Sequence, residues 1–255
     1  GHYDSVAIEA VLIFFMVCAA INFASHFAAL RQRSMRVYVG DAEAKALVAV
    51  IAAGWMAVSL YLWAHGQYAD FASAFRHAGF NLVSVVTTTG YASTDYSQWP
   101  PFAVFLVLLL ACGTCSTGST GNGIKMFRTL MLVQQAAREL KRLIHPQVVA
   151  PLRFGSHVVP NAIVYAILAF IFFYFVVIVG VSFVLMASGM EVVTAFSASI
   201  AWINNIGPAL NEIGPAGNFS HLTDFQKWVG IFAMLTGRLE LFTVLVLFTP
   251  AFWRK

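Results

Sequence analysis

Long apolar runs alternate with short polar segments along this chain. Four of the runs approach or exceed the roughly 20 residues that cross the core of a bilayer. They cover residues 6–30, 46–64, 160–187 and 227–253. A fifth apolar stretch, residues 102–144, is interrupted partway by a loop rich in Gly, Ser and Thr. The pattern predicts an all-α integral membrane protein with five crossings.

Two further segments, residues 71–86 and 191–203, are too short and too polar to cross. Their length predicts re-entrant helices, which enter the membrane and return to the same side. Irregular backbone at membrane depth must be buried in protein or must line a water-filled path. We therefore expect the turn after each segment to be either a cation filter or an ordinary helix-capping turn.

The filter interpretation requires main-chain carbonyls that replace the hydration shell of an ion. Candidate filter residues are Thr87, Thr88, Thr89 and Gly90 in the first turn and Asn204, Asn205, Ile206 and Gly207 in the second. A bound cation is predicted at Thr88, Thr89, Asn205 and Ile206. Because the turns follow matching segments about 117 residues apart, the sequence favours two filters within an internal membrane repeat.

The loop at residues 113–123 interrupts a membrane segment, so it predicts a gate or a pore-lining linker rather than a simple structural break. Its candidate gating residues are Gly113, Ser116, Gly118, Ser119, Thr120, Gly121 and Gly123. The loop lacks the spacing of a phosphate-binding loop. If it obstructs the ion path, its deletion should raise cation flux.

Arg238 lies about a dozen residues into the last apolar run. An arginine at that depth is costly and usually faces a bundle interior or a water-filled cavity. Two interpretations remain: a positive charge set against the cation path, as part of the gate, or a structural ion pair with a distant carboxylate.

Composition narrows the class of protein. The chain is 60% hydrophobic and 10% charged, with a formal net charge of +4, which excludes an ordinary soluble domain. Its charges form no basic face with interleaved aromatic residues, so nucleic acid is not an expected partner, whereas membrane lipid is. Lys and Arg concentrate in residues 31–45 and 125–157. By the positive-inside rule, these segments and the C-terminus are cytoplasmic.

Four motifs together make the chain resemble the TrkH-type potassium transporters of the Trk/Ktr/HKT superfamily, in their C-terminal half. They are Val85-Val86-Thr87-Thr88-Thr89-Gly90-Tyr91-Ala92, Cys115-Ser116-Thr117-Gly118-Ser119-Thr120-Gly121-Asn122-Gly123-Ile124-Lys125, Asn204-Asn205-Ile206-Gly207-Pro208 and Gly237-Arg238-Leu239-Glu240. The resemblance covers nearly the whole chain. One departure is Asn122, which stands where the family commonly has glycine.

The resemblance implies a pseudo-fourfold pore built from four span–pore helix–span repeats. Residues 1–45 would be the last helix of a preceding repeat and a connector. Residues 46–145 and 146–255 would be the third and fourth repeats, the first of them with the broken inner helix. It also implies that Gly90 and Gly207 are filter glycines, that residues 113–123 are the gate and that Arg238 points into the pore.

The expected function is potassium uptake across a bacterial cytoplasmic membrane, with K⁺ as cargo and no covalently bound cofactor. A sodium- and potassium-permeable member of the superfamily remains an alternative, as does a secondary transporter of a small solute. An enzyme is not expected, because no spanning segment carries a catalytic motif. The expected partners are the missing N-terminal repeats or a companion half, a second copy in a homodimer, and a cytosolic ring of nucleotide-binding Rossmann-type subunits.

Overall fold

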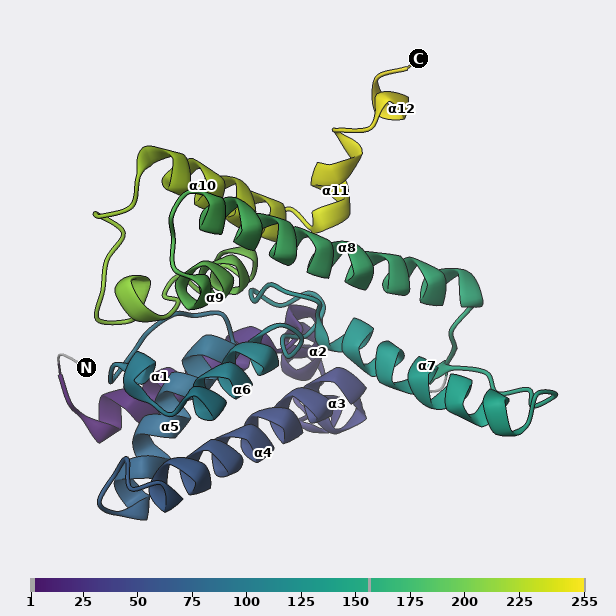
Figure 1. The fold of residues 1–255 in the computed structure, drawn as a ribbon. Coiled ribbons are helices and arrows are strands. Elements are labelled where there is room, and N and C mark those ends of the chain that lie inside the picture. The colour runs from purple at the N-terminus through teal and green to yellow at the C-terminus, as the bar shows by residue number, and fades with distance from the viewer. Residues whose placement is uncertain (1–2, 156, 255) are drawn as a thin grey trace.

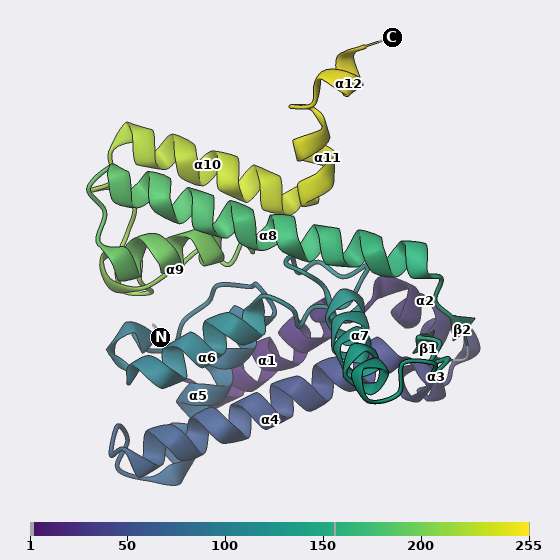
Figure 2. The same cartoon turned by 45° about the vertical axis from the view of Figure 1, so that its right-hand side comes forward.

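The computed structural model describes residues 3–155 and 157–254, which are helical except for one short hairpin and the connecting turns (Figures 1 and 2). The helices of the first half are α1 (Val6–Ala20), α2 (Phe23–Gln32), α3 (Arg36–Gly40), α4 (Ala42–Ala64), α5 (Phe71–Val86), α6 (Pro101–Ala111) and α7 (Met126–Ile144). The hairpin strands are β1 (Arg153–Phe154) and β2 (His157–Val158). The remaining helices are α8 (Asn161–Ala187), α9 (Val192–Ile203), α10 (Asp224–Arg238), α11 (Leu241–Val246) and α12 (Pro250–Trp253). Two single 3₁₀ turns cover Tyr96–Gln98 and Asn211–Ile213.

The first apolar run, which the sequence predicts as one crossing, is not a single straight helix. The run divides into α1 and α2, whose axes differ by 99°. Ile21 is extended, and the side chain of Asn22 accepts a hydrogen bond from the Ala24 amide at 2.8 Å. Asn22 is therefore the N-cap of a new helix, because its amide oxygen satisfies a donor that the break exposes.

Helix α5 packs between α4, α6 and α1. Trp55 of α4 donates a hydrogen bond from Nε1 to the Phe75 carbonyl at 2.7 Å and stacks on the Phe75 ring. A Cβ at Gly79 would lie 2.0 Å from the Trp55 ring. The absence of a side chain at Gly79 thus lets the indole lie against the α5 backbone.

The last apolar run is also broken, so the prediction of one final span over residues 227–253 was wrong. Helix α10 ends at Arg238, Glu240 has φ of 60°, and α11 begins at Leu241. Figure 1 shows α11 and α12 turning away from the rest of the chain. Within the helical part, a Cβ at Gly237 would lie 1.8 Å from the Ile203 carbonyl oxygen, so glycine permits close contact between α10 and α9.

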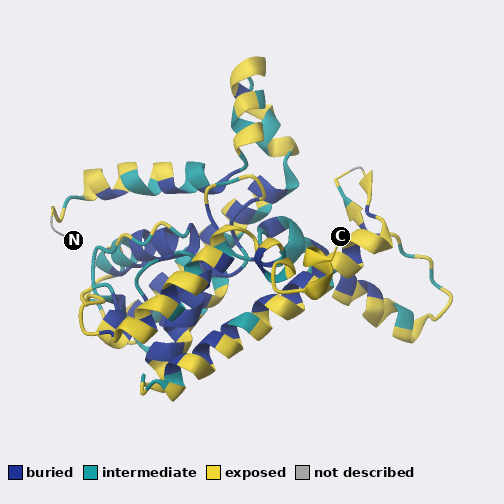
Figure 3. Cartoon of the chain, turned by 90° about the horizontal axis from the view of Figure 1, so that it is seen from above, coloured by how far each residue is buried: buried dark blue, intermediate teal, exposed yellow. Residues whose placement is uncertain are grey.

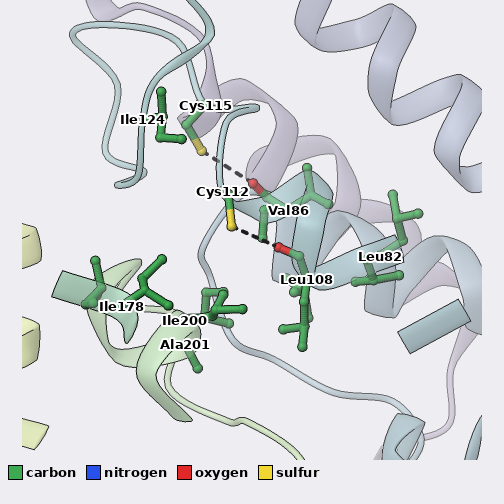
Figure 4. Close-up of a cluster of buried hydrophobic side chains, with 14 of the residues drawn as sticks. Leu82, Val86, Leu108, Cys112, Cys115, Ile124, Ile178, Ile200 and Ala201 are labelled. Carbon is green, nitrogen blue, oxygen red and sulfur yellow. Dashed lines mark hydrogen bonds between the residues drawn. The ribbon is translucent and has the colours of Figure 1, made fainter. Parts of the chain in front are cut away.

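The two halves of the chain share one buried core. Figure 4 shows Val86 and Leu108 from the first half near Ile200 and Ala201 of α9, with the Cys112 side chain between them. Figure 3 shows exposed and buried positions alternating along the long helices, and many of the exposed residues are large apolar ones. Exposed apolar faces on helices of this length are expected where lipid is the solvent.

Helices α4 and α8 are each long and apolar enough to cross a membrane, and the bent pair α1–α2 adds a third crossing if it is counted as one broken span. The two other predicted crossings fall on interrupted helices, α6–α7 and α10–α11. Helices α5 and α9 are 16 and 12 residues long, as the sequence predicts for re-entrant segments.

Candidate ion pathway

The first candidate filter is the turn that ends α5. Its amides point back into the helix: Thr88 N donates to the Val85 carbonyl at 3.0 Å, and Thr89 N donates to the Ser84 carbonyl at 2.8 Å. Thr88 has φ of 56° and Gly90 has φ of 85°. This pair of bonds around a left-handed residue is a Schellman motif, which satisfies the last carbonyls of a helix.

The second candidate filter has the same backbone. Asn205 N donates to the Trp202 carbonyl at 3.0 Å, and Ile206 N donates to the Ala201 carbonyl at 2.8 Å. Asn205 has φ of 54° and Gly207 has φ of 102°. The sequences Thr-Thr-Thr-Gly and Asn-Asn-Ile-Gly thus adopt one conformation at the ends of two helices.

This conformation leaves main-chain acceptors free. Within the described residues, nothing donates a hydrogen bond to the carbonyls of Thr87–Gly90 or Asn204–Gly207. Both turns also follow the C-termini of their helices, where the helix dipole is negative. Free carbonyl oxygens and the negative ends of helix dipoles are both features that attract cations.

The two turns approach each other at Gly90. A Cβ at this position would lie 2.0 Å from the Ile206 carbonyl oxygen, so only glycine lets that carbonyl come so close to the first turn. A Cβ at Gly207 would meet nothing within 4 Å. The two glycines share a positive φ but differ in their surroundings.

The N-termini of the same two helices carry acidic caps. The Asp70 carboxylate accepts a hydrogen bond from Ser73 N at 2.7 Å, and the Glu191 carboxylate accepts one from Thr194 N at 2.9 Å. These amide hydrogen bonds lower the pKa of Asp70 and of Glu191, both of which lie outside the long spanning helices. Each pore-helix candidate is thus capped by a carboxylate at one end and faces free carbonyls at the other.

The glycine-rich loop of residues 113–123 lies beside the first turn. Asn122 N donates to Thr88 Oγ1 at 3.3 Å, and Cys115 Sγ contacts the Val86 carbonyl oxygen at 3.5 Å. Asn122, at the one departure from the family motif, is therefore a contact between loop and turn. Thr88, a predicted filter residue, therefore contacts the predicted gate directly.

Residues 116–120 of this loop bind to the break between α1 and α2. Ser116 N donates to the Ala20 carbonyl at 3.0 Å, and Thr120 N donates to the Ala19 carbonyl at 3.2 Å. In return, the Gly118 carbonyl accepts a hydrogen bond from Phe23 N at 3.2 Å. The carbonyls that the broken helix no longer uses internally thus bind the loop.

The ends of the loop are tied to each other and to α7. Ile124 N, next to Gly123, donates to the Cys112 carbonyl at 2.7 Å, and Thr129 Oγ1 donates to the Gly113 carbonyl at 3.1 Å. Inside the loop, Ser119 Oγ donates to the Ser116 carbonyl at 2.6 Å, and Lys125 Nζ donates to the Gly121 carbonyl. These hydrogen bonds hold the loop that contains all seven residues predicted for a gate.

Glu43 is a contact that sequence reasoning missed. Its Oε1 accepts hydrogen bonds from Thr117 N at 3.2 Å, Thr117 Oγ1 at 3.0 Å and Phe127 N at 2.7 Å. The residue is 5% exposed. One buried carboxylate at the start of α4 thus fixes both the loop and the first turn of α7. A buried carboxylate of this kind needs donors, but no local sequence signal names them.

Arg238 does not lie in the middle of a continuous span, which corrects the sequence-based placement. It is exposed at the end of α10, and its Nη1 donates to the Thr120 carbonyl at 3.1 Å. Arg238, Lys125 and Glu240 line a cavity of about 170 Å³ between the loop and helices α8–α10. Glu240 pairs with Arg128 at 3.3 Å rather than with Arg238.

A second missed feature joins α1 to the first re-entrant helix. Arg76 of α5 binds Glu9 through Nε at 2.7 Å and Nη2 at 2.8 Å, and it also binds Asp4 at 2.7 Å. Glu9 is 8% exposed and is held by these hydrogen bonds from Arg76. The one sequence signal that could have indicated this contact is the presence of isolated charges in apolar segments, because such charges usually pair with one another.

Two re-entrant helices that end in matching turns, packed among helices long enough to span a bilayer, define a polytopic membrane protein of the transport class. Comparison with known proteins gives the family. The model for the TrkH family, described as cation transport protein, matches residues 1–255. This chain belongs to that family of cation transport proteins, and its predominantly helical membrane fold is confirmed.

Comparison with individual relatives supports the same family assignment. The chain is 41% identical to the Trk system potassium uptake protein TrkH of Halomonas elongata over 259 residues, which is 100% of this chain and 52% of that protein. It is 37% identical to the protein of the same name from Escherichia coli (strain K12), over 100% of this chain and 52% of that protein. The crystal structure of the potassium transporter TrkH from Vibrio parahaemolyticus matches with a TM-score of 0.93 and 40% identity, over 98% of this chain and 54% of that chain.

The chain spans about half the length of these relatives. The matched part is their C-terminal half, as the four motifs predict.

Proposed function

We propose that this chain supplies two of the carbonyl-lined turns of a potassium uptake pore, with K⁺ held by the carbonyls of Thr88, Thr89, Asn205 and Ile206. The observation that carries the proposal is the matched Schellman geometry, which directs the amides into the helices and leaves the carbonyls without donors from the described part of the chain. A partly dehydrated cation needs such preformed oxygens. The names of the relatives, which are potassium uptake proteins, support potassium as the cargo.

In this proposal, residues 46–145 and 146–255 are two pore repeats, and residues 1–45 close the preceding one. Two turns cannot surround an ion, so the remaining turns come from further repeats or from a companion half. The proposed location is a bacterial cytoplasmic membrane with the C-terminus in the cytoplasm, as the positions of Lys and Arg favour. Assembly as a homodimer with a cytosolic nucleotide-binding ring belongs to the same proposal.

The glycine-rich loop is proposed as the gate. It contacts Thr88 through Asn122 and is held by the α1–α2 break, by Glu43 and by Arg238. Each of these contacts is a hydrogen bond that can be broken without unfolding a helix, so the loop can leave while the turns stay in place. The guanidinium of Arg238 adds a positive charge beside the cavity, which opposes the entry of cations while the loop is closed.

Flux measurements test this function. Potassium and sodium uptake would be measured in liposomes that contain the chain alone and the chain co-expressed with the missing half. We expect potassium-selective uptake in the presence of the missing half, and higher uptake when residues 117–121 are shortened to a Gly-Gly link. Sodium uptake equal to potassium uptake would indicate the non-selective alternative.

The same flux measurements can also contradict the proposal. If folded protein carries neither cation in either preparation, the pore proposal fails and a transporter of a small solute becomes the better explanation. If flux is selective but does not rise when the loop is shortened, the filter stands and the gate fails.

A further inference from the structure

The end of α7 carries a buried arginine with few partners. Arg138 is 6% exposed. Its Nη1 donates one hydrogen bond to Asn161 Oδ1 at 3.0 Å, and its Nε is buried without a hydrogen-bond partner among the residues that the structure describes. A guanidinium offers five N–H donors. A buried charge with so few contacts is unfavourable unless an anion compensates it.

The nearby carboxylate does not supply that compensation. Glu139 Oε1 is 3.8 Å from Arg138 Nε, 3.1 Å from Arg142 Nη1 and 2.9 Å from Gln135 Nε2. The Glu139 side chain is also 50% exposed. One solvated carboxylate is therefore shared by two guanidiniums, and the site keeps a net positive charge.

A cleft opens beside these groups. It has a volume of about 330 Å³ and lies between the end of α7, the β1–β2 hairpin and the start of α8. Arg138 and Arg142 line it on one side, and apolar residues that include Val149, Leu152 and Val159 line the rest. Asn161 begins α8, so the positive end of the dipole of a 27-residue helix also borders the cleft.

The position of the cleft indicates its surroundings. Helix α8 is the most apolar spanning helix of the described chain, so its first residue lies near a membrane surface. The concentration of Lys and Arg in residues 125–157 assigns that surface to the cytoplasmic side. The cytoplasmic leaflet carries anionic lipids, and basic pockets between helices on that side are suited to their headgroups.

We propose that this cleft binds the phosphate group of an anionic phospholipid. The phosphate oxygens accept hydrogen bonds from Arg138 and Arg142 in the bidentate geometry that guanidinium favours. The apolar wall contacts the upper part of an acyl chain. The site is independent of the proposed filter and gate, and it connects α7, which follows the glycine-rich loop, to the lipid of the inner leaflet.

Binding to the protein purified in detergent tests the proposal. Native mass spectrometry would compare phosphatidylglycerol with phosphatidylcholine, which carries the same phosphate with a neutralising choline. We expect several-fold tighter binding of phosphatidylglycerol, and about tenfold weaker binding in Arg138→Gln. Arg31→Gln is the matched control, because Arg31 is an exposed arginine on the same predicted side that does not line the cleft.

Thermal unfolding provides a second measurement. Because the buried guanidinium is poorly compensated without lipid, Arg138→Gln should fold and should lose the phosphatidylglycerol-dependent rise in Tm. If Arg138→Gln does not fold, Arg142→Gln should give a smaller loss of the same lipid effect. The proposal is overturned if phosphatidylcholine binds equally well, if Arg31→Gln loses as much binding as the cleft variants, or if inorganic phosphate alone gives the same rise in Tm.

Discussion

The two re-entrant units of this chain end in turns of the same geometry but have different inner segments. Both α5 and α9 end in a Schellman turn with a left-handed residue and a glycine. Below the first turn, α6 stops at Ala111 and a long loop precedes α7. Below the second turn, α10 stops at Arg238 and only two residues precede α11.

The breaks themselves correspond. Lys125, immediately before α7, has φ of 74°, and Glu240, immediately before α11, has φ of 60°. Non-glycine residues rarely adopt such values without an external constraint. Both units therefore interrupt the inner helix in the same way, and the first unit adds the glycine-rich loop at that interruption. The comparison suggests that the break belongs to the repeat and that the loop is the specialised element.

The largest predicted effect separates Gly90 from Gly207, the glycines of the two candidate filters. Gly90→Ala places a methyl group against the Ile206 carbonyl oxygen at a positive φ, and we expect it to cost about 2–5 kcal/mol and to abolish flux. Gly207→Ala meets only the conformational cost of about 1–2 kcal/mol. Thermal unfolding and potassium flux of both variants measure the difference. Equal losses would mean that the two turns do not approach each other as described.

Glu43 tests whether the loop is held in place. Glu43→Gln weakens three hydrogen bonds to one oxygen, and we expect the loop to loosen by about 2 kcal/mol. The Thr117 and Phe127 amides should then exchange hydrogen faster, and flux should rise about 30-fold. Glu212→Gln, at an exposed carboxylate in an outer loop, is the control. Unchanged exchange at Thr117 would rule out this anchor.

Arg238 should have a smaller effect, because it is exposed and makes one hydrogen bond to the loop. Arg238→Ala removes that bond and the positive charge, so we expect a severalfold increase in flux, whereas Arg238→Lys should keep most of the wild-type restriction. Potassium uptake of the three proteins at matched protein levels is the measurement. Loss of folded protein in Arg238→Ala alone would favour the structural interpretation.

The acidic caps should give the smallest effect and should affect both units alike. The folded-state pKa values of the two carboxyl groups are lowered. The stabilisation that they provide is therefore fully present above their unfolded pKa values, which are 3.8 for Asp70 and 4.5 for Glu191, and it is lost as pH falls through the folded values. Asp70→Asn and Glu191→Gln should therefore reduce the loss of Tm below about pH 4. An unaltered pH profile in the double variant would exclude this contribution.

The re-entrant helices could be predicted because their signal is local. Residues 71–86 and 191–203 are short, semi-polar and followed by glycine, and α5 (Phe71–Val86) and α9 (Val192–Ile203) agree closely with them. Hydrophobic length alone could not locate the breaks at Asn22 and Glu240, because the surrounding residues stay apolar. The hydrogen bonds that compensate those breaks come from other parts of the chain.

Sequence reasoning missed some of the site contacts for the same reason. Glu43 binds Thr117, and Glu9 binds Arg76, across 74 and 67 positions of sequence. No periodicity connects such pairs, although a lone charge in an apolar segment suggests that a partner exists. The filter and gate residues came from motifs, and the structure supplies their surroundings, while their roles in conduction remain predictions.

The most direct measurement concerns the carbonyls of the two turns. Solid-state NMR of the assembled protein, with ¹³C-labelled carbonyls in Thr, Asn and Ile, would be recorded in potassium, in sodium and in a large organic cation. The pore account predicts potassium-specific shifts at Thr88, Thr89, Asn205 and Ile206, and none at the helical Ile178 carbonyl. Carbonyl shifts that do not respond to potassium in protein that conducts it would contradict the account.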